Sequence, residues 1–301
     1  MEKLKFDVRK MLKILWIVLN YSVRIAAAVL ILWWCMLRIG EWKDFQVFRE
    51  WNQVYEFEGN GTYEDPYLIS SADDLIKFSE AVNNGNYFFG MYFKQTDDID
   101  MSECDNFIPI GCMDSGYMFR GIYDGGGHTI SNLIINANSL DSKFVGLFGK
   151  LGGVVMNLGI ESGRISGDYV GSIAAADGST DAMIINCYNK ADLYAIVRCG
   201  GIADNFSVGR ILGCANYGHL SGNVTCQIVS YNCSIICGCC NVQTSHDYIV
   251  PYDTFAGSVY DCFIGTTDRT ELNDYIDVYQ DFIIYPDDPV FDIIPWQPQD
   301  D

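Results

Sequence analysis

Apolar and polar residues change their pattern three times along this chain of 301 residues. A largely apolar run fills residues 14–37, a helix-like pattern follows between Ser71 and Asn83, and short apolar segments separated by glycines begin at Phe119. Leu75 and Phe78 belong to a helical repeat, whereas the later segments have the composition of strands. The pattern predicts one membrane helix, one amphipathic helix and a body of short strands.

The run Ile14–Leu37 would form a helix about 36 Å long, which exceeds the roughly 30 Å hydrocarbon core of a bilayer. Arg24 near its middle disfavours insertion, but the surrounding Leu, Ile and Val offset that cost. Basic residues precede the run, so the positive-inside rule predicts a cytoplasmic N-terminus and an extracellular body in a single-pass cell-membrane protein. A cleaved signal peptide ending at Ala26–Ala28 is the alternative.

The segments after the apolar run repeat. Val145, Val170 and Gly200 begin similar stretches that are 25 and 30 residues apart. A repeat of this length predicts a solenoid, in which short strands bury their apolar faces only by stacking on the strands of neighbouring turns. We therefore predict an all-β parallel β-helix. Its first open end would be capped by the short helix, for which Ser71 and Asp74 resemble a capping box.

Identical residues of such a solenoid form ladders. Alignment of "ISNLII", "VMNLGI" and "IINCYN" places Asn132, Asn157 and Asn186 in one polar ladder. Cys187 and Cys214 recur at the same period, followed by Cys239 or Cys240 and by Cys262. We interpret them as buried free thiols. Disulfide bridges and a metal site remain alternatives, although the stretch "CGCC" at Cys237–Cys240 has no second CxxC pair or His at the spacing typical of zinc.

The stretch "FRGIYDGGGHTISNLII" resembles a phosphate-binding or catalytic loop. No helix follows its glycines, so a phosphate would lack the helix N-terminus that such loops supply. A sharp corner explains the residues better, because Gly125 and Gly127 permit tight turns and Asp124 can accept hydrogen bonds from its own backbone. His128 would then pack at that corner.

Charge is uneven along the chain. Of the 19 Lys or Arg and 39 Asp or Glu, nine basic and five acidic residues lie in the first fifty positions. The remaining body is therefore strongly acidic and repels nucleic acid, so we expect no nucleic-acid partner.

These blocks in this order, from "GTYEDPYLISSADDLIKFSEAVNNG" through "YFKQTDDIDMS", "FIPIG", the glycine stretch, "VGLFG" and "NCYN", resemble bacterial surface proteins with GLUG-type repeats. The resemblance covers Gly61 to Cys262 and implies a right-handed parallel β-helix in an adhesin-like envelope protein without catalytic residues in the repeat. Similar repeats occur beside proteases that cleave immunoglobulin A. This chain lacks the HExxH zinc motif and the length of such a domain.

We expect a non-catalytic, membrane-anchored module that binds an extracellular polymer or protein. The alternative is a carbohydrate-active β-helix enzyme, for which Asp98 and Asp100 on one side of the segment "TDDID" are the candidate carboxylates. We expect no cofactor. Calcium at the Asp-rich turns is a lesser alternative, since their spacing does not match an EF-hand.

The predicted organisation has six parts. They are a cytoplasmic basic segment (1–13), a membrane anchor (14–37), a linker (38–58), a capping region with the helix (59–112), the repeats (113–268), and a C-terminal cap with an acidic tail (269–301).

Overall fold

The computed structural model describes residues 55–112, 116–137, 140, 143–237, 239–241, 258–260 and 263–264. These residues belong to the second of two units in the chain, Tyr55–Asp301. The predicted basic segment, membrane anchor and C-terminal cap lie outside the described residues. Within the part that the structure describes, no helix is long and apolar enough to cross a bilayer.

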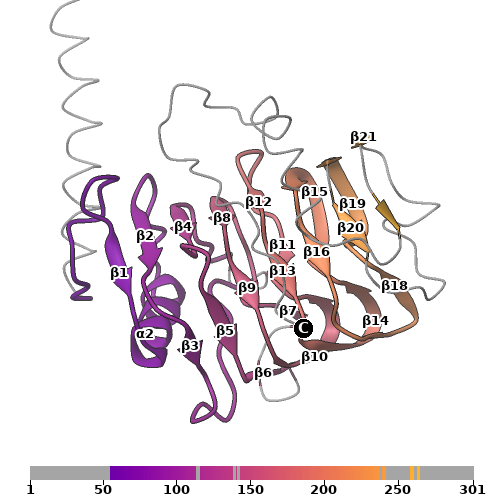
Figure 1. The fold of residues 1–301 in the computed structure, drawn as a ribbon, viewed down its shortest axis with the longest axis horizontal. Helices are drawn as coiled ribbons and strands as arrows, with labels where there is room; N and C mark the ends of the chain where they lie inside the picture. The colour runs from indigo at the N-terminus through magenta and orange to yellow at the C-terminus, as the bar shows by residue number, and fades with distance from the viewer. Residues whose placement is uncertain are drawn as a thin grey trace, which may run out of the picture. The chain divides into compact units, whose positions relative to one another are not determined.

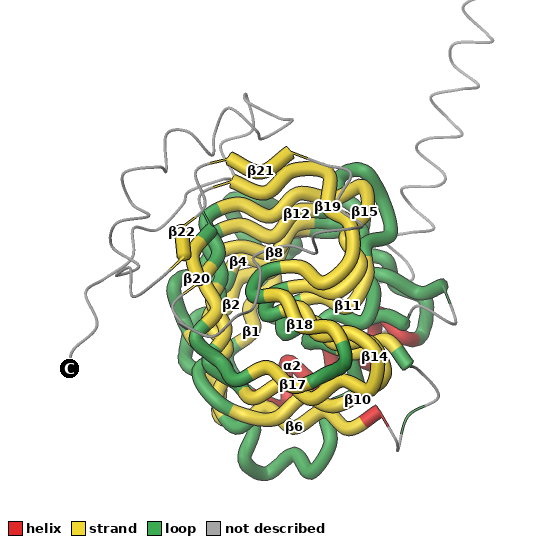
Figure 2. The backbone as a smooth tube through the Cα atoms, turned by 90° about the vertical axis from the view of Figure 1, so that its right-hand side faces the viewer, coloured by secondary structure: helices red, strands yellow, loops and turns green. Residues whose placement is uncertain are grey.

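Strands from successive repeats form three sheets whose members lie side by side (Figures 1 and 2). The nine-stranded sheet contains β1 (Tyr67–Ile69), β2 (Tyr92–Gln95), β4 (Ile122–Asp124), β8 (Val154–Met156), β12 (Met183–Ile185), β15 (Ala203–Leu212), β19 (Val229–Cys237) and β21 (Ser258–Tyr260), with β11 (Ala174–Ala176) beside β15. The seven-stranded sheet contains β3 (Ile99–Asp100), β5 (Thr129–Ser131), β9 (Gly159–Ile160), β13 (Tyr188–Asn189), β16 (Ala215–Asn216), β20 (Cys240–Asn241) and β22 (Phe263–Ile264). The six-stranded sheet contains β6 (Leu133–Asn136), β10 (Gly163–Gly171), β14 (Asp192–Gly200) and β17 (Leu220–Ser221), with β7 (Phe144–Val145) and β18 (Val224–Cys226) beside them.

Every pairing between these strands is parallel, and each joins residues about one repeat apart. In the nine-stranded sheet, for example, Tyr123 pairs with Val155, which pairs with Ile184. Figure 2 looks along the stack and shows the strands of successive turns superposed. The predicted all-β parallel solenoid is confirmed, with about six turns.

The one helix of the described residues, α2 (Ala72–Asn83), begins and ends where the sequence predicts. The Ser71 side chain accepts a hydrogen bond from the Asp74 amide at 3.2 Å. The amide of Asn84 donates to the Glu80 carbonyl at the other end. Leu75, Phe78 and Val82 are fully buried, because their spacing places them on one face of the helix. That face covers the interior of the turns nearest the N-terminus.

Candidate functional site

The "YDGGGH" stretch forms the corner between β4 and β5. The Asp124 carboxylate accepts a hydrogen bond from the Gly126 amide at 3.0 Å and one from Asn157 Nδ2 in the next turn at 2.9 Å. Gly127 has a φ of +81°, and a Cβ on Gly125 would lie 2.4 Å from the Asn157 carbonyl oxygen. Glycine meets the need for a positive φ at one position and for the absence of a Cβ at the other, so these residues form a sharp corner packed against the next turn.

The asparagine ladder differs in one member from the alignment of the sequence. Asn186 Nδ2 donates to Asn157 Oδ1 at 2.8 Å, and both residues follow strands of the nine-stranded sheet with φ near +50°. Asn132 has a similar φ of 56° but follows β5 of the seven-stranded sheet. Its Nδ2 donates instead to Asp100 at 2.8 Å. The structure therefore places Asn132 at a different corner from the other two.

The repeated cysteines lie inside the solenoid as free thiols. Cys187, Cys214 and Cys239 are fully buried, and the amides of Cys187 and Cys214 point at the sulfur of the next member, 3.5 and 3.4 Å away. Burial raises the pKa of the Cys214 thiol well above its ordinary value. Cys262 lies outside the described residues.

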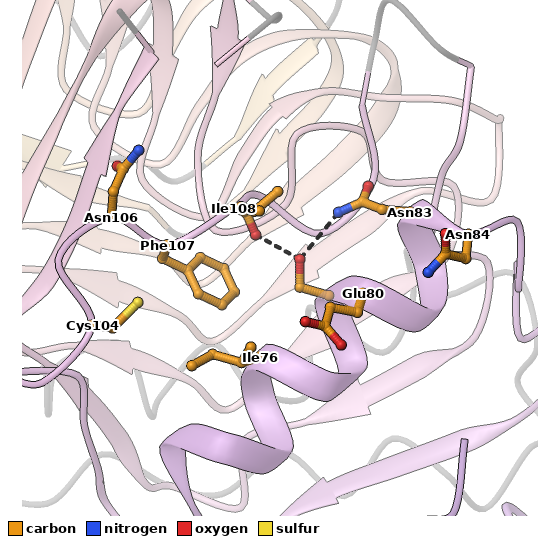
Figure 3. Close-up of a pocket in the computed structure, with 9 residues that line it drawn as sticks. Ile76, Glu80, Asn83, Asn84, Cys104, Asn106, Phe107 and Ile108 are labelled. Atoms are coloured by element: carbon orange, nitrogen blue, oxygen red, sulfur yellow. Dashed lines mark hydrogen bonds between the residues drawn. The ribbon is translucent and has the colours of Figure 1, made fainter. Parts of the chain in front are cut away.

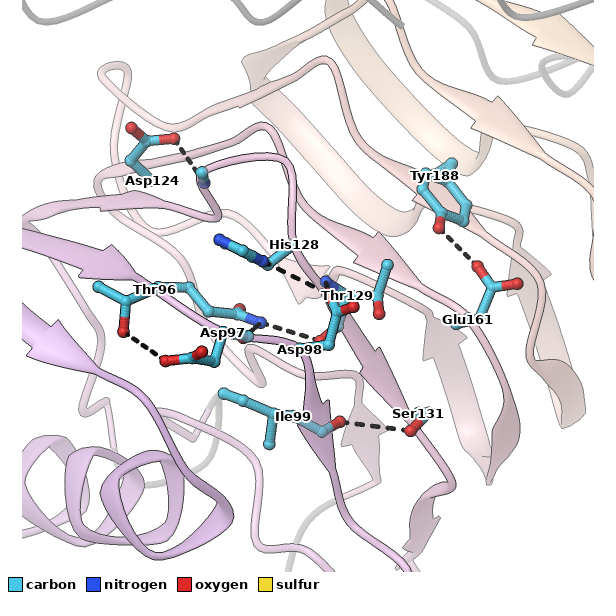
Figure 4. Close-up of polar contacts among 12 residues, drawn as sticks. Thr96, Asp97, Asp98, Ile99, Asp124, His128, Thr129, Ser131, Glu161 and Tyr188 are labelled. Carbon is cyan, nitrogen blue, oxygen red and sulfur yellow. Dashed lines mark hydrogen bonds and ion pairs between the residues drawn. The ribbon is translucent and has the colours of Figure 1, made fainter. Parts of the chain in front are cut away.

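The two candidate carboxylates of "TDDID" accept hydrogen bonds from backbone amides at the edge of the seven-stranded sheet, and Figure 4 shows the contacts of Asp98. Asp98 Oδ1 accepts a hydrogen bond from the Thr129 amide at 2.8 Å and lies 3.5 Å from His128 Nδ1. Asp100 Oδ1 accepts from Asn132 Nδ2 and from the Ser102 amide. These two donors lower the pKa of Asp100, which keeps this carboxylate ionised.

An ionised carboxylate can accept hydrogen bonds or act as a nucleophile, but it cannot protonate a leaving group. Glycoside hydrolysis also needs a carboxylic acid with a raised pKa. Another carboxylate on this sheet, Glu161, accepts a hydrogen bond from the Tyr188 hydroxyl at 2.5 Å and pairs with Lys190 at 2.6 Å. Within the described ranges, no three His, Cys, Asp or Glu side chains gather as they would around a metal ion.

A cavity of about 230 Å³ lies between α2 and residues 104–108 (Figure 3). Ile76 and Phe107 line it, and Glu80 lies at its edge. Ser79 Oγ donates to the Ile108 carbonyl at 2.6 Å, which ties the helix to this segment. The cavity is thus part of the packing of the capping helix.

The outer side of the six-stranded sheet carries stacked aromatic and arginine side chains that the sequence analysis missed. Phe144 of β7, Tyr169 of β10 and Arg198 of β14 occupy paired positions in successive turns. The Phe144 and Tyr169 rings stack with centroids 4.5 Å apart, and the Arg198 guanidinium lies 4.7 Å from the Tyr169 centroid. The signal was present in the alternation of β10 and β14, where Tyr169 precedes the buried Val170 and Arg198 precedes the buried Cys199.

Arg198 also anchors this row to the solenoid. Its guanidinium donates two hydrogen bonds of 3.1 Å to Asp204, which is fully buried and also accepts a hydrogen bond from the Ser230 hydroxyl. Burial raises the pKa of Asp204, while Arg198 and Ser230 counteract that rise. Tyr231 lies on the guanidinium as well, at 4.3 Å. The contacts with Asp204 and Tyr231 therefore fix the position of the Arg198 side chain in this row.

A second pair of arginine and tyrosine side chains lies on the same side of the six-stranded sheet. The Arg164 guanidinium lies 4.1 Å from the centroid of Tyr194, and Tyr194 contacts His219 of the following turn. Ile196 is 62% exposed beside them. We call Phe144, Arg164, Tyr169, Tyr194, Ile196 and Arg198 the aromatic–arginine face.

Two sequence relatives are similar to part of this chain. Halomucin of Haloquadratum walsbyi is 34% identical over 161 residues, which are 50% of this chain and 2% of halomucin. A proposed Gly-rich membrane protein of Evansella cellulosilytica is 33% identical over 142 residues, 44% of this chain and 15% of that protein. The chain thus matches only a small part of either relative's length.

No family model matches the chain. Among solved structures, a proposed immunoglobulin A1 protease from Bacteroides ovatus is similar over 68% of this chain and 77% of its own, with 24% identity and a TM-score of 0.47.

Proposed function

We propose that this chain is a non-catalytic binding module displayed at the cell surface, and that the aromatic–arginine face contacts its partner. The single observation that carries this proposal is the stack of Phe144, Tyr169 and Arg198 across three successive turns. Aromatic and arginine side chains are enriched at the centres of interfaces. Here their stacking and the Asp204 contact fix their conformations before binding, which lowers the entropy lost on association.

Display at the surface is the second part of the proposal. It rests on the apolar run 14–37, on the resemblance to GLUG-type adhesin-like proteins, and on a relative named as a membrane protein. In this arrangement the N-terminus is cytoplasmic and the body extracellular. Protease added to intact cells should degrade the body, whereas full protection would contradict this topology.

A non-catalytic role fits the contacts of the acidic segment. Asp98 and Asp100 accept hydrogen bonds from backbone and side chains of the adjacent turn, so their carboxylates have a structural use. The alternative, a carbohydrate-active enzyme, makes a clear prediction. Turnover of a neutral or anionic polysaccharide by the pure protein, lost in Asp98→Ala, would overturn the non-catalytic assignment.

Binding through the aromatic–arginine face can be tested directly. The purified full chain should be applied to immobilised polysaccharides and extracellular-matrix proteins, in parallel with the variants Arg164→Gln and Tyr194→Ala. Because such residues are common hot spots, we expect each variant to weaken binding at least about tenfold. Tyr117→Ala is the matched control, since Tyr117 is 36% exposed and lies outside this face. Binding that persists in both face variants would refute this assignment, and no binding to any ligand class would leave a purely structural role.

A further inference from the structure

A second cavity, of about 190 Å³, lies where four neighbouring strands of the nine-stranded sheet begin. Phe89 precedes β2, Arg120 precedes β4, Gly152 and Gly153 precede β8, and Asp181 precedes β12. We propose that this cavity binds one sugar unit of a neutral glycan. The inference rests on the proposed binding function and adds a site and a ligand class to it.

Glycines give the cavity a floor of backbone. A Cβ on Gly153 would lie 2.0 Å from the Gly121 carbonyl oxygen, and one on Gly121 would lie 2.5 Å from the Met91 carbonyl oxygen. A Cβ on Gly152 would lie 3.1 Å from Arg120 Cγ. No larger residue fits at the first two positions without a shift of the backbone. The glycines therefore let the turns approach closely, so that backbone forms part of the cavity wall.

Phe89 supplies an apolar platform at one end. Its ring is 59% exposed, although the Arg120 guanidinium lies 5.0 Å from its centroid. One ring face is thus covered by the arginine while much of the ring stays accessible. The C–H face of a pyranose has the shape and polarity to lie on such a ring.

Arg120 lines the cavity and supplies hydrogen-bond donors to it. Its Nε is buried and has no hydrogen-bond partner among the described residues. A buried donor without an acceptor is unfavourable, so a rotation of the Arg120 side chain that brought Nε to a ligand oxygen in the cavity would remove an existing cost. A sugar hydroxyl or ring oxygen can serve as that acceptor.

Asp181 supplies the complementary acceptor on the opposite side of the glycine floor. A ligand that contacts both ends must offer an acceptor to Arg120, donors to Asp181 and an apolar surface to Phe89. A sugar ring combines all three. An anionic sugar would be repelled by Asp181 and by a chain whose formal net charge is −20.

The size of the cavity limits the ligand. Pockets for drug-sized molecules measure about 300 to 1,000 Å³, so the present volume suits a single ring. Four strands spaced about 4.8 Å apart extend over about 14 Å, which leaves room for the adjoining sugars of a chain to follow the strand ends.

The test begins with the purified full chain on an array of neutral hexose and N-acetylhexosamine oligosaccharides, with oligogalacturonate as the anionic arm. Calorimetry then measures the strongest neutral binder. We expect Phe89→Ala and Arg120→Gln each to weaken it at least tenfold and Asp181→Asn at least fivefold. Melting temperatures establish that the variants are folded. Tyr117→Ala, at a half-exposed site outside this cavity, should change the affinity less than twofold.

Three outcomes overturn the proposal: no neutral oligosaccharide binds, only oligogalacturonate binds, or the best neutral binder keeps its affinity in both Phe89→Ala and Arg120→Gln. The same variants separate it from the proposed function. If the best neutral oligosaccharide depends on Arg164 and Tyr194 but not on Phe89, it binds the aromatic–arginine face and the sugar site is refuted. If it depends on Phe89 but not on Arg164 and Tyr194, the sugar site is supported and the aromatic–arginine face is left to a different partner.

Discussion

The turns nearest α2 and the turns beyond β8 fill their interiors in different ways. Around α2 the interior is aromatic. Phe78 stacks on Phe93 with centroids 4.4 Å apart, meets Phe119 edge-on at 5.1 Å and lies 5.8 Å from Tyr123. Helix α2 thus closes the first turns by packing Phe78 among aromatic side chains of those turns.

Beyond β8 the interior is filled mostly by aliphatic side chains, and it also includes small ones. Ala174, Ala175 and Ala176 are fully buried, as are Cys187 and Cys214. These residues pack against the same positions of the next turn, so each turn is completed by its neighbours. The helix end therefore depends on a cluster of aromatic side chains, whereas the later repeats depend on ladders of aliphatic, small and polar ones.

The largest expected effect follows from emptying the aromatic end. Phe78→Ala should lower the free energy of unfolding by about 3 to 5 kcal/mol, because it removes a fully buried ring from the centre of the cluster. Urea denaturation measures this change. Phe89→Ala is the control, since this ring is 59% exposed and its loss should cost less than about 0.5 kcal/mol. A cost below about 1 kcal/mol for Phe78→Ala would contradict the role given to the helix.

A substitution in the asparagine ladder should give the next largest loss of stability. Asn157→Ala removes hydrogen bonds to Asp124 and Asn186 and places alanine at a φ of 52°. The unpaired buried groups and the left-handed backbone should together cost about 2 to 4 kcal/mol. Asn157→Gly keeps the backbone conformation and should be less destabilising. Equal losses in chemical denaturation would show that backbone strain contributes nothing.

A substitution in the cysteine ladder should lower the stability by a smaller amount. Cys214→Ser puts a hydroxyl into a dry interior and should cost about 1 to 3 kcal/mol. Cys104→Ser, at a partly exposed site beside α2, should leave thermal unfolding nearly unchanged. In the folded protein a thiol reagent should modify Cys104 much faster than Cys214, because Cys214 is fully buried. Rapid labelling of Cys214 under native conditions would refute the packed ladder.

The smallest effect concerns the start of α2. Burial would raise the pKa of Asp74, but hydrogen bonds from Ser71, Ser70 and Lys77 outweigh it and lower the pKa. Its contribution to stability is therefore present above about pH 4 and is lost as the pH falls through the lowered pKa. Asp74→Asn should remove less than about 1 kcal/mol of this pH-dependent free energy of unfolding, since solvent screens the site. The change would be measured as a flatter acid side in a plot of melting temperature against pH. Asp73→Asn is the matched control, and an equal flattening there would argue against the Ser71 contact.

Local signals explain which features the sequence could reveal. Helix α2 was predictable because its apolar spacing and its Ser71 cap lie within one short segment. The solenoid was predictable because its apolar positions recur. Asn132 was misaligned because its corner needs the same left-handed backbone as that of Asn157, and only the strand pairing distinguishes the two sheets.

The candidate binding sites gave only a partial signal, for the opposite reason. The alternation of β10 and β14 indicates that Tyr169 and Arg198 point outward, but Phe144, Tyr169 and Arg198 come from three different turns, and only the strand pairing makes them neighbours. The sugar cavity likewise combines Phe89, Arg120 and Asp181 from separate turns. Their proximity depends on the register of the strands, which is a property of the folded solenoid.

The parallel pairing of adjacent turns also bears on how the chain folds. Each strand finds its partner about one repeat away, as Tyr123 does with Val155 and Val155 with Ile184. Folding can therefore advance one turn at a time, since a completed turn offers a ready edge to the next. In a chain that emerges with its N-terminus first, the residues of the aromatic cluster around Phe78 become available for folding first. That cluster would nucleate the solenoid before the later turns had emerged.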